Sequence, residues 1–219
     1  EERYPEFAGN ISTCRSPQQM LGAMIRQAYR MKGETKRLVS VSVMPCTAKK
    51  AEIRRPDSRT FGEQDIDYSL TTSELLTLMA GAGIRAEDCT PAQADDPFSV
   101  GSGGGALFGN TGGVTEAVLR YLSPKLGFQQ TDWIPPEVRG EQGIRRLTID
   151  NGTLQVHAAI VSGLHNAALL MDRVRRGEEQ LDLIEVMACP GGCVMGGGQP
   201  ADVYDVYRNR KDRRAGLYH

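Results

Sequence analysis

The sequence predicts an α/β protein of two lobes with a cofactor in the cleft between them, and three observations support this prediction. Short apolar, β-branched segments alternate with segments of helical periodicity. Cysteines directly follow two of the predicted strands, at the edge where open α/β sheets bind ligands. The 219 residues are enough to bury a substantial core, as one large domain or two small lobes.

In the first half of the chain, Ser16 and Pro17 are typical of a helix start, and apolar residues spaced for one face predict a helix over 18–31. The run 38–44 predicts a buried strand. A short strand is expected over 66–70, followed by a helix that Thr71 or Thr72 caps and that ends near Ala80, before two glycines. Residues 84–100 look irregular.

In the second half, two glycine clusters flank residues 106–108 before a helix predicted over 114–122. The turn Asp150-Asn151-Gly152 predicts a hairpin of strands 145–149 and 154–161. A helix over 164–175 and a strand over 183–186 follow. The segment after Pro200 is predicted to be helical.

Composition excludes several classes of protein. The 26 basic and 27 acidic residues leave a formal charge of −1, which gives no long-range attraction for nucleic acid or an anionic membrane, so we expect neither as a partner. No run of 18 apolar residues exists, as a membrane span would need. The five cysteines are odd in number and lack a disulfide-framework pattern, which indicates reduced thiols in an intracellular, cytoplasmic setting or thiols bound to a metal. The chain does not begin with methionine, so a periplasmic location stays open.

The segment 189–200 is the most informative part of the sequence, because it places Cys189 and Cys193 one helical turn apart among five glycines. Thiolates are soft ligands for iron-sulfur clusters, copper(I) or zinc. Glycines let the backbone approach a bulky cofactor where a Cβ would intrude. The alternative is a glycine turn that carries two buried structural cysteines.

A second cysteine, Cys46, follows the predicted strand 38–44. Lys49 is three residues further on, so a helix that begins near Thr47 would let it reach the same site as a hydrogen-bond donor, although a solvated lysine is the simpler alternative. Glu52 can pair with Lys49 across one turn, as a surface ion pair worth a few tenths of a kcal/mol.

A zinc site and a nucleotide-binding site are less consistent with the sequence. A closed zinc site normally has paired C-x2-C units or histidine partners, and the three histidines are in no such register. Cys14 and Cys89 lack nearby partners and are interpreted as ordinary core or loop cysteines. The glycine clusters near Phe108 lack the G-K-[ST] ending and the acidic residue of nucleotide-binding loops.

Residues 44–52 and 185–200 resemble the second and third signature motifs of the iron-only (FeFe) hydrogenases. Further matches occur at 16–19, at Asp67, at 71–75 and at 108–117. The motifs are long, occur in the family's order, and extend over nearly the whole chain. The chain is therefore identified as similar to the C-terminal part of that family's catalytic, H-cluster domain over residues 1–219, incomplete at the N-terminus.

This resemblance implies an H-cluster, which is a 4Fe-4S cubane joined through one cysteine sulfur to a diiron subcluster with CO, cyanide and a bridging dithiolate. It implies reversible reduction of protons to H2 with ferredoxin or a similar electron-transfer protein or subunit. Cys46 and Cys189 would ligate the cubane, and Cys193 would bind the cubane and bridge to the diiron unit. The other implied site residues are Lys49 at a cyanide, Gln18 at the diiron ligands, Met44 and Met187 around the diiron unit, Pro45, Phe108 and Gly109 as its wall, Ser12 as a proton relay, and Glu52.

The chain departs from the family in lacking the first motif, T-S-C-C-P, which supplies a fourth cubane ligand and a proton-donating thiol. We therefore expect the missing N-terminal part of the enzyme and the hydrogenase maturation proteins to be partners, and little activity from the 219 residues alone. Two alternatives share the motifs: a cluster-assembly protein that makes no hydrogen, and a sensory hydrogenase-like domain.

Overall fold

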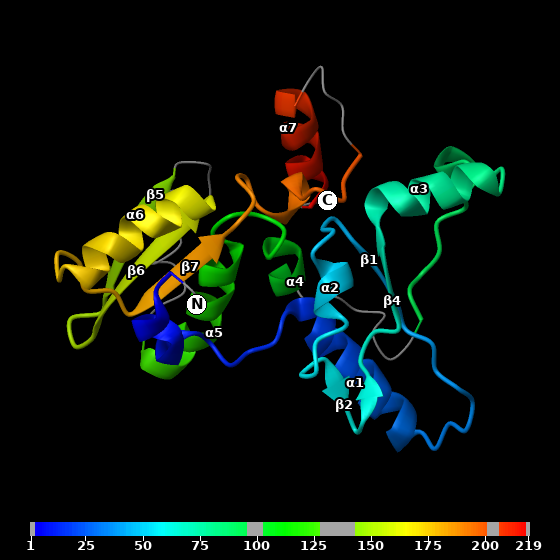
Figure 1. The fold of residues 1–219 in the computed structure, drawn as a ribbon, viewed down its shortest axis with the longest axis horizontal. Helices are drawn as coiled ribbons and strands as arrows, with labels where there is room; N and C mark the ends of the chain where they lie inside the picture. Colours follow the sequence, from blue (N-terminus) through cyan, green and yellow to red (C-terminus); the bar gives the residue numbers. More distant parts are fainter. Residues whose placement is uncertain (1–2, 96–102, 128–142, 201–205, 218–219) are drawn as a thin grey trace. The chain divides into compact units, whose positions relative to one another are not determined.

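The computed structural model describes residues 3–95, 103–127, 143–200 and 206–217. They form two compact units: unit 1 comprises Glu1–Val100 and Gly197–Pro200, and unit 2 comprises Gly101–Gly196 and Ala201–His219. Each unit combines helices with strands (Figure 1), which confirms the predicted α/β class.

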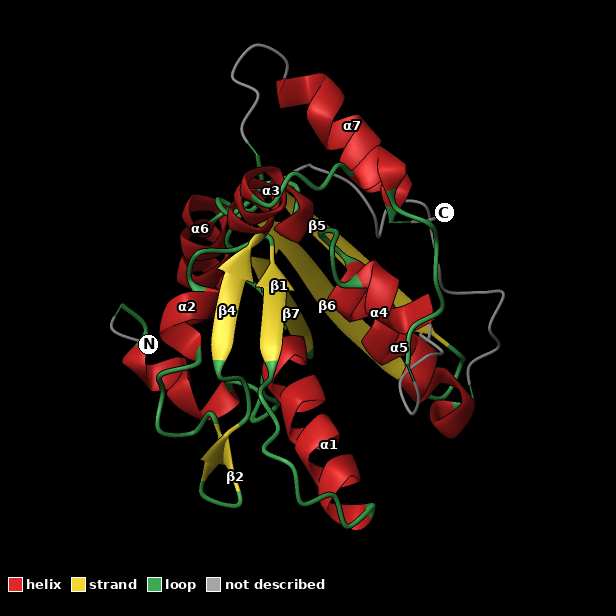
Figure 2. Cartoon of the chain, turned by 90° about the vertical axis from the view of Figure 1, so that its right-hand side faces the viewer, coloured by secondary structure: helices red, strands yellow, loops and turns green. Residues whose placement is uncertain are grey.

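Unit 1 is built on a parallel pair of strands, β1 (Val41–Met44) and β4 (Tyr68–Thr71), which run side by side in the same direction (Figure 2). The predicted helix before them is α1 (Pro17–Met31), and it begins as expected, because the Ser16 hydroxyl accepts a hydrogen bond from the backbone NH of Gln19 at 3.4 Å. Gly22 lets α1 approach closely, since a Cβ there would lie 2.7 Å from the carbonyl oxygen of Asp65.

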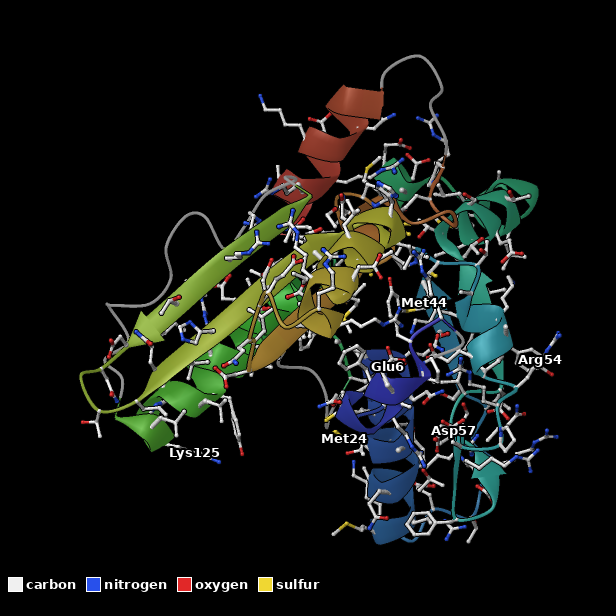
Figure 3. All side chains as sticks on the ribbon, turned by 60° about the vertical axis from the view of Figure 1, so that its left-hand side comes forward. Glu6, Met24, Met44, Arg54, Asp57 and Lys125 are labelled. Carbon is white, nitrogen blue, oxygen red and sulfur yellow. The ribbon has the colours of Figure 1, made fainter. Side chains whose placement is uncertain are left out.

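Helix α1 buries its polar face and exposes its apolar one. Gln18, Gln19 and Arg26 are buried, whereas Leu21 and Met24 are 48% and 57% exposed, and Met24 projects from the helix (Figure 3). The apolar spacing predicted the helix but not which face turns inward. Burial of the polar face is sustained by hydrogen bonds, as buried polar groups require.

Strand β1 differs from the buried strand predicted over 38–44. It covers Val41–Met44 only, and Val41 and Val43 remain 53% and 45% exposed. The reason is that β1 pairs with a single strand and its side chains alternate between two faces. Ser42 faces Gln18 of α1, and the described part of unit 1 leaves the valine face open.

Short helices follow both strands of unit 1. Helix α2 (Lys49–Glu52) begins just after Cys46, and α3 (Thr72–Gly81) directly follows β4. Thr71 caps α3, as predicted, through a capping box: its hydroxyl accepts from the NH of Glu74, and the Glu74 carboxylate accepts from the NH of Thr71. A small hairpin of β2 (Arg59–Thr60) and β3 (Glu63–Gln64), which the sequence did not reveal, lies between α2 and β4 in the chain.

Unit 2 contains a three-stranded sheet of β5 (Ile144–Asp150), β6 (Gln155–Ser162) and β7 (Leu183–Met187). Strands β5 and β6 form the predicted antiparallel hairpin, and β7 pairs with β6 in parallel through the crossover helix α6 (Leu164–Arg175). The buried core lies between sheet and crossover helix, where Ala159, Val161 and Leu170 have no exposed surface.

The remaining helices of unit 2 are α4 (Gly103–Leu107), α5 (Gly113–Leu126) and α7 (Val206–Gly216). Helix α4 was not predicted, because its glycines carry no helical signal. Helix α5 extends beyond the predicted 114–122, through Pro124, and ends at Gly127 with φ 75°. Helix α7 confirms the helical prediction over 206–216, and residues 201–205 of that prediction lie outside the described residues. Among the described residues, no helix combines the length and apolarity needed to cross a membrane.

Candidate functional site

Cys46 lies at the C-terminal end of β1, where the sequence placed it. The consecutive residues Met44, Pro45 and Cys46 are all half-buried. The strand pair ends here, and α2 begins at Lys49, three residues after Cys46. The end of β1 therefore presents a thiol next to a short helix that carries a cation.

Glycine 198, from the far end of the cysteine-glycine motif, packs against this segment of unit 1. Its NH donates to the carbonyl oxygen of Pro45 at 3.0 Å, and its own carbonyl accepts from the NH of Ser73 at 3.0 Å. A Cβ at Gly198 would lie 2.9 Å from the backbone nitrogen of Cys46. Only glycine fits here, because the approach is of backbone to backbone.

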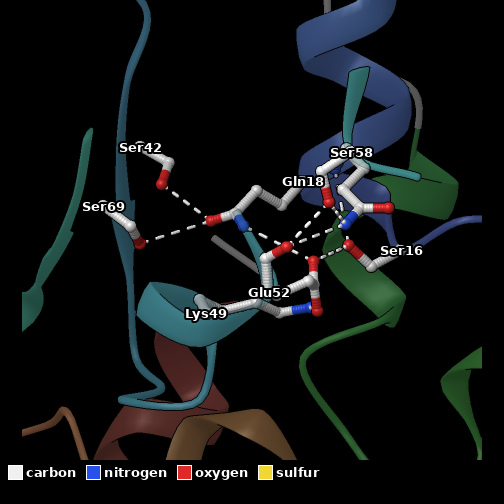
Figure 4. Close-up of polar contacts among 8 residues, drawn as sticks. Ser16, Gln18, Ser42, Lys49, Glu52, Ser58 and Ser69 are labelled. Carbon is white, nitrogen blue, oxygen red and sulfur yellow. Dashed lines mark hydrogen bonds and ion pairs between the residues drawn. The ribbon is translucent and has the colours of Figure 1, made fainter. Parts of the chain in front are cut away.

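Lys49 and Glu52 form a half-buried ion pair within a polar network (Figure 4). The ammonium Nζ lies 2.5 Å from the carboxylate Oε2, and the two side chains are 17% and 18% exposed. The other oxygen, Oε1, accepts hydrogen bonds from the Ser16 hydroxyl and, at 3.4 Å, from the Gln18 amide. The pair is thus not the surface ion pair that the sequence suggested.

The same network fixes the orientation of Gln18. Its amide oxygen accepts from the hydroxyls of Ser42 at 2.7 Å and Ser69 at 3.4 Å, so its NH2 group turns toward Glu52. An ammonium has three donors, and Glu52 is the partner of Lys49 among the residues the structure describes. Lys49 therefore keeps donors for a bound ligand, held in place by an anchored carboxylate.

In unit 2, β7 ends at Met187 and the loop after it carries Cys189 and Cys193; all three residues are half-buried. The loop is anchored on both sides of Cys193. The NH of Gly191 donates to the hydroxyl of Ser162 at 3.3 Å, and the NH of Val194 donates to the carbonyl of Gly109 at 3.1 Å. The second contact places Gly109 next to Val194, the residue after Cys193.

Gly192 explains why the motif needs glycine. Its φ is 90° and ψ is −171°, a region in which side chains are strongly disfavoured. A Cβ there would lie 2.6 Å from the Gly109 carbonyl oxygen and 2.8 Å from the Thr111 nitrogen. The sequence suggested that glycine admits the cofactor, but at Gly192 and Gly198 it admits protein backbone.

A buried carboxylate occupies the N-terminus of α5. Glu185 of β7 is 5% exposed and accepts hydrogen bonds from the NH groups of Gly112 and Thr115, each at 2.7 Å. Carboxylates are stabilised at helix N-termini by these donors and by the helix dipole. The anion position that a nucleotide phosphate would need at this glycine cluster is therefore filled by the protein itself.

Ser12 is the predicted site residue that stands apart from the network. It is exposed, and its hydroxyl accepts a hydrogen bond at 3.2 Å from the NH of Cys14, which is also exposed. Cys89 is exposed as well, and its thiol donates to the carbonyl of Arg85. Cys14 and Cys89, interpreted from the sequence as core or loop cysteines, both lie outside the core.

The residues present fit a cluster bound by thiolates. Cys46, Cys189 and Cys193 are half-buried thiols outside any disulfide. The buried hydroxyls of Thr111, in the loop that contacts the motif, and of Thr115, in the first turn of α5, find no hydrogen-bond partner within the described ranges.

Over those same ranges, no three His, Cys, Asp or Glu side chains converge as they would around a single metal ion. In a cubane each thiolate binds a different iron atom, so the ligand sulfur atoms are farther apart than those around a single metal ion.

Sequence reasoning missed several residues of both sites. Ser16, Ser42, Ser58 and Ser69 build the network around Glu52, and Glu185 links β7 to α5. One signal was available for Glu185, since a lone carboxylate interrupts the apolar run of β7. Ser42 and Ser69 gave none, because a polar residue that alternates with apolar ones is ordinary in a half-exposed strand.

A family model described as "Iron only hydrogenase large subunit, C-terminal domain" matches residues 1–197. The large subunit of a periplasmic Fe hydrogenase from Nitratidesulfovibrio vulgaris is 41% identical over 203 residues, which are 91% of this chain and 48% of that protein. A cytosolic Fe-S cluster assembly factor from Xenopus tropicalis is 30% identical over 201 residues, 86% of this chain and 41% of that protein.

Among solved structures, a variant of an FeFe-hydrogenase from Chlamydomonas reinhardtii superposes with a TM-score of 0.81 at 33% identity, over 99% of this chain and 62% of that one. The chain thus spans about half the length, or less, of the curated relatives described above.

Proposed function

The chain belongs to the iron-only hydrogenase large-subunit family, whose C-terminal domain model matches residues 1–197, and we propose that it forms part of a catalytic H-cluster domain. The proposed reaction is the reversible combination of two protons and two electrons to give H2. The domain boundaries proposed are 1–219, as the C-terminal part of a longer domain. Since the chain matches only part of its relatives, activity is proposed for the whole protein.

One observation carries the proposal: the continuation of the cysteine-glycine motif is bonded to the segment that holds the other cysteine. Gly198 donates to the Pro45 carbonyl and packs on the backbone of Cys46, and Cys193 precedes it by only five residues. This supports shared ligation by Cys46 and Cys193, which are 147 positions apart in the sequence.

The residues proposed to hold the cofactor are the three half-buried thiols. Cys46 and Cys189 would ligate the 4Fe-4S cubane, and Cys193 would bind the cubane and bridge to the diiron subcluster. When bound, this group would pass electrons from the electron-transfer partner to protons and supply the iron chemistry that forms H2. Pro45 and the Phe108-Gly109 backbone would form the wall of its pocket, and Met44 and Met187 would exclude water around it.

Lys49 is proposed to donate a hydrogen bond to a cyanide of the diiron subcluster, held in position by Glu52. Gln18 is proposed to contact the same ligands through its NH2 group. The hydroxyls of Ser42 and Ser69 donate to its amide oxygen, so the NH2 group points away from them. Ser12 is proposed as a proton relay, because its exposed hydroxyl can exchange protons with solvent. The hydroxyl is the group that such a relay requires.

The proposed partners are ferredoxin or another electron-transfer protein, the hydrogenase maturation proteins, and the part of the domain that carries the first cysteine motif. We propose a cytoplasmic location, where thiols stay reduced, as in the cytosolic relative. Because another relative is periplasmic, cell fractionation is the direct test of the proposed location.

A second function is favoured by one observation, the 30% identity to a cytosolic Fe-S cluster assembly factor. Such a protein would use the same thiols to bind a cubane without turning over hydrogen. The two functions differ in the need for a diiron unit, and therefore in the importance of Lys49 and of the bridging thiol of Cys193.

The deciding experiment uses the full-length gene product, matured anaerobically with the hydrogenase maturation proteins and supplied with reduced viologen. We expect hydrogen evolution from the wild type, none from C193S, and loss of the diiron unit with retention of the cubane in K49A. C89S is the matched control, because that thiol is exposed and bonded only to its own turn.

Near-normal hydrogen evolution by C193S would refute the ligand roles. A wild-type protein that binds a cubane but evolves no hydrogen would favour the assembly function instead.

A further inference from the structure

Glu185 is a buried acid that the proposed chemistry does not use. It lies on β7 between Ile184 and Val186, is 5% exposed, and bonds through Oε1 to the NH of Gly112 and through Oε2 to the NH of Thr115. Burying a carboxylate is costly unless its oxygens are fully satisfied. On this otherwise apolar strand, the two bonds satisfy both of its oxygens.

The two bonds require a carboxylate rather than any polar side chain. Two backbone NH groups at the start of α5 point at two different oxygens, so both positions must be acceptors. A glutamine amide has one acceptor oxygen and would turn its NH2 group toward the other NH. Arg145 of β5 interacts electrostatically with this carboxylate: burial lowers the pKa of its guanidinium, and the Glu185 carboxylate opposes that shift.

These bonds close a ring of contacts within unit 2. Glu185 precedes Cys189 by four residues on the strand that leads into the motif. The loop it binds begins at Gly109, whose carbonyl accepts from Val194, directly after Cys193. The strand that delivers one thiol is thereby tied to the loop that receives the other.

The ring has little freedom to adjust. A Cβ at Gly192 would meet the Gly109 oxygen at 2.6 Å, and a Cβ at Gly113 would meet the Leu107 oxygen at 1.7 Å. Both contacts are with backbone, which cannot rotate away. A shift of the α5 N-terminus therefore moves the backbone that borders Cys193.

We propose that Glu185 is a positioning residue, which sets the spacing of the Cys189 and Cys193 thiols before a cluster binds. The proposal rests on the proposed function in one respect, namely that these thiols are cluster ligands. It predicts that loss of one bond disturbs the thiols more than it disturbs folding.

The test compares E185Q, which loses one acceptor, and E185D, which keeps the charge on a shorter stem, in the full-length protein. E178Q is the control, because Glu178 is exposed and pairs only with Arg176 and its neighbours. In the cluster-free protein, amide hydrogen exchange at Gly112 and Thr115 and alkylation rates of the two thiols are measured. After anaerobic reconstitution, the rate of iron loss to a chelator and the electron paramagnetic resonance spectrum of the reduced cluster are measured.

For E185Q we expect exchange at both amides, and iron loss, to be faster by about tenfold or more, the usual effect of losing a charge-assisted hydrogen bond. The resonance spectrum should change, and E185D should fall between E185Q and wild type. E178Q should match the wild type in every measurement.

The positioning role is refuted if amide exchange at Gly112 and Thr115 is fast in E185Q, but its thiol alkylation rates, its rate of iron loss and its resonance spectrum match those of the wild type. It is also refuted if neither variant folds without a cluster, since Glu185 would then be a requirement of the fold. If the wild type itself binds no cluster, the proposed function fails, and the alkylation rates alone decide the positioning role.

Discussion

Replacement of Gly192 by alanine tests the backbone packing around the cysteine motif. The glycine has φ 90° and ψ −171°, and a Cβ would lie 2.6 Å from the Gly109 oxygen and 2.8 Å from the Thr111 nitrogen. Gly197 is the matched control, because a Cβ there meets nothing within 4 Å and its φ is not in the left-handed region.

The expected cost of G192A follows from these contacts. Backbone strain of a side chain in this region costs about 1–3 kcal/mol. Overpacking against rigid backbone costs a further 1–3 kcal/mol, roughly. The reduced entropy of the unfolded chain offsets about 0.4–1 kcal/mol. The net loss is therefore about 1–6 kcal/mol, whereas G197A should change stability by less than about 0.5 kcal/mol.

Urea unfolding of the reduced, cluster-free protein, followed by circular dichroism, measures both values. With a slope of about 1–3 kcal/mol per molar urea, the G192A midpoint should fall by about 0.3 M at least, and by about 1.5 M in the middle of these ranges. Equal midpoints for G192A and G197A would show that the loop is not packed on residues 109–111, and would refute the reasoning from Cβ contacts.

Four further predictions concern unit 1. E52Q should lower the free energy of unfolding by about 1–3 kcal/mol, because a half-buried acceptor of several bonds is weakened, and should speed acylation of Lys49, measured by mass spectrometry. The hydrogen bond from Lys50 and the NH of Thr71 lower the pKa of Glu74 from 4.5 to about 2, so K50A should raise that pKa toward 4.5 in a nuclear magnetic resonance titration. T71A should cost about 1 kcal/mol through loss of the helix cap. Since the folded pKa of Glu74 is depressed, its stabilisation is fully present above about pH 4.5 and is lost as the pH falls toward 2, a trend that unfolding experiments across this range would reveal.

The parts of the fold that the sequence predicted are those set by neighbouring residues. Helix α6 and the hairpin at Asp150 follow from apolar spacing and from a strong turn. The cap of α3 follows from a threonine three residues before a glutamate. All of these signals operate within one or two turns of chain.

The features that escaped prediction depend on residues far apart in the sequence. Glu185 and Gly112 are 73 positions apart, and Ser73 and Gly198 are 125 apart. The inward polar face of α1 could not be predicted for the same reason. Gln18 is tolerated inside only because Ser42, Glu52 and Ser69, from three other segments, satisfy its amide.

The most direct test of the central claim, that three thiols bind one iron-sulfur cluster, is iron and sulfide content with Mössbauer spectroscopy after anaerobic reconstitution of the 219-residue chain. We predict a substoichiometric, oxygen-sensitive cluster in the wild type, its loss in C46S, C189S and C193S, and wild-type cluster content in C14S and C89S. Full cluster content in any of the first three variants, or loss of the cluster in C14S or C89S, would contradict the claim.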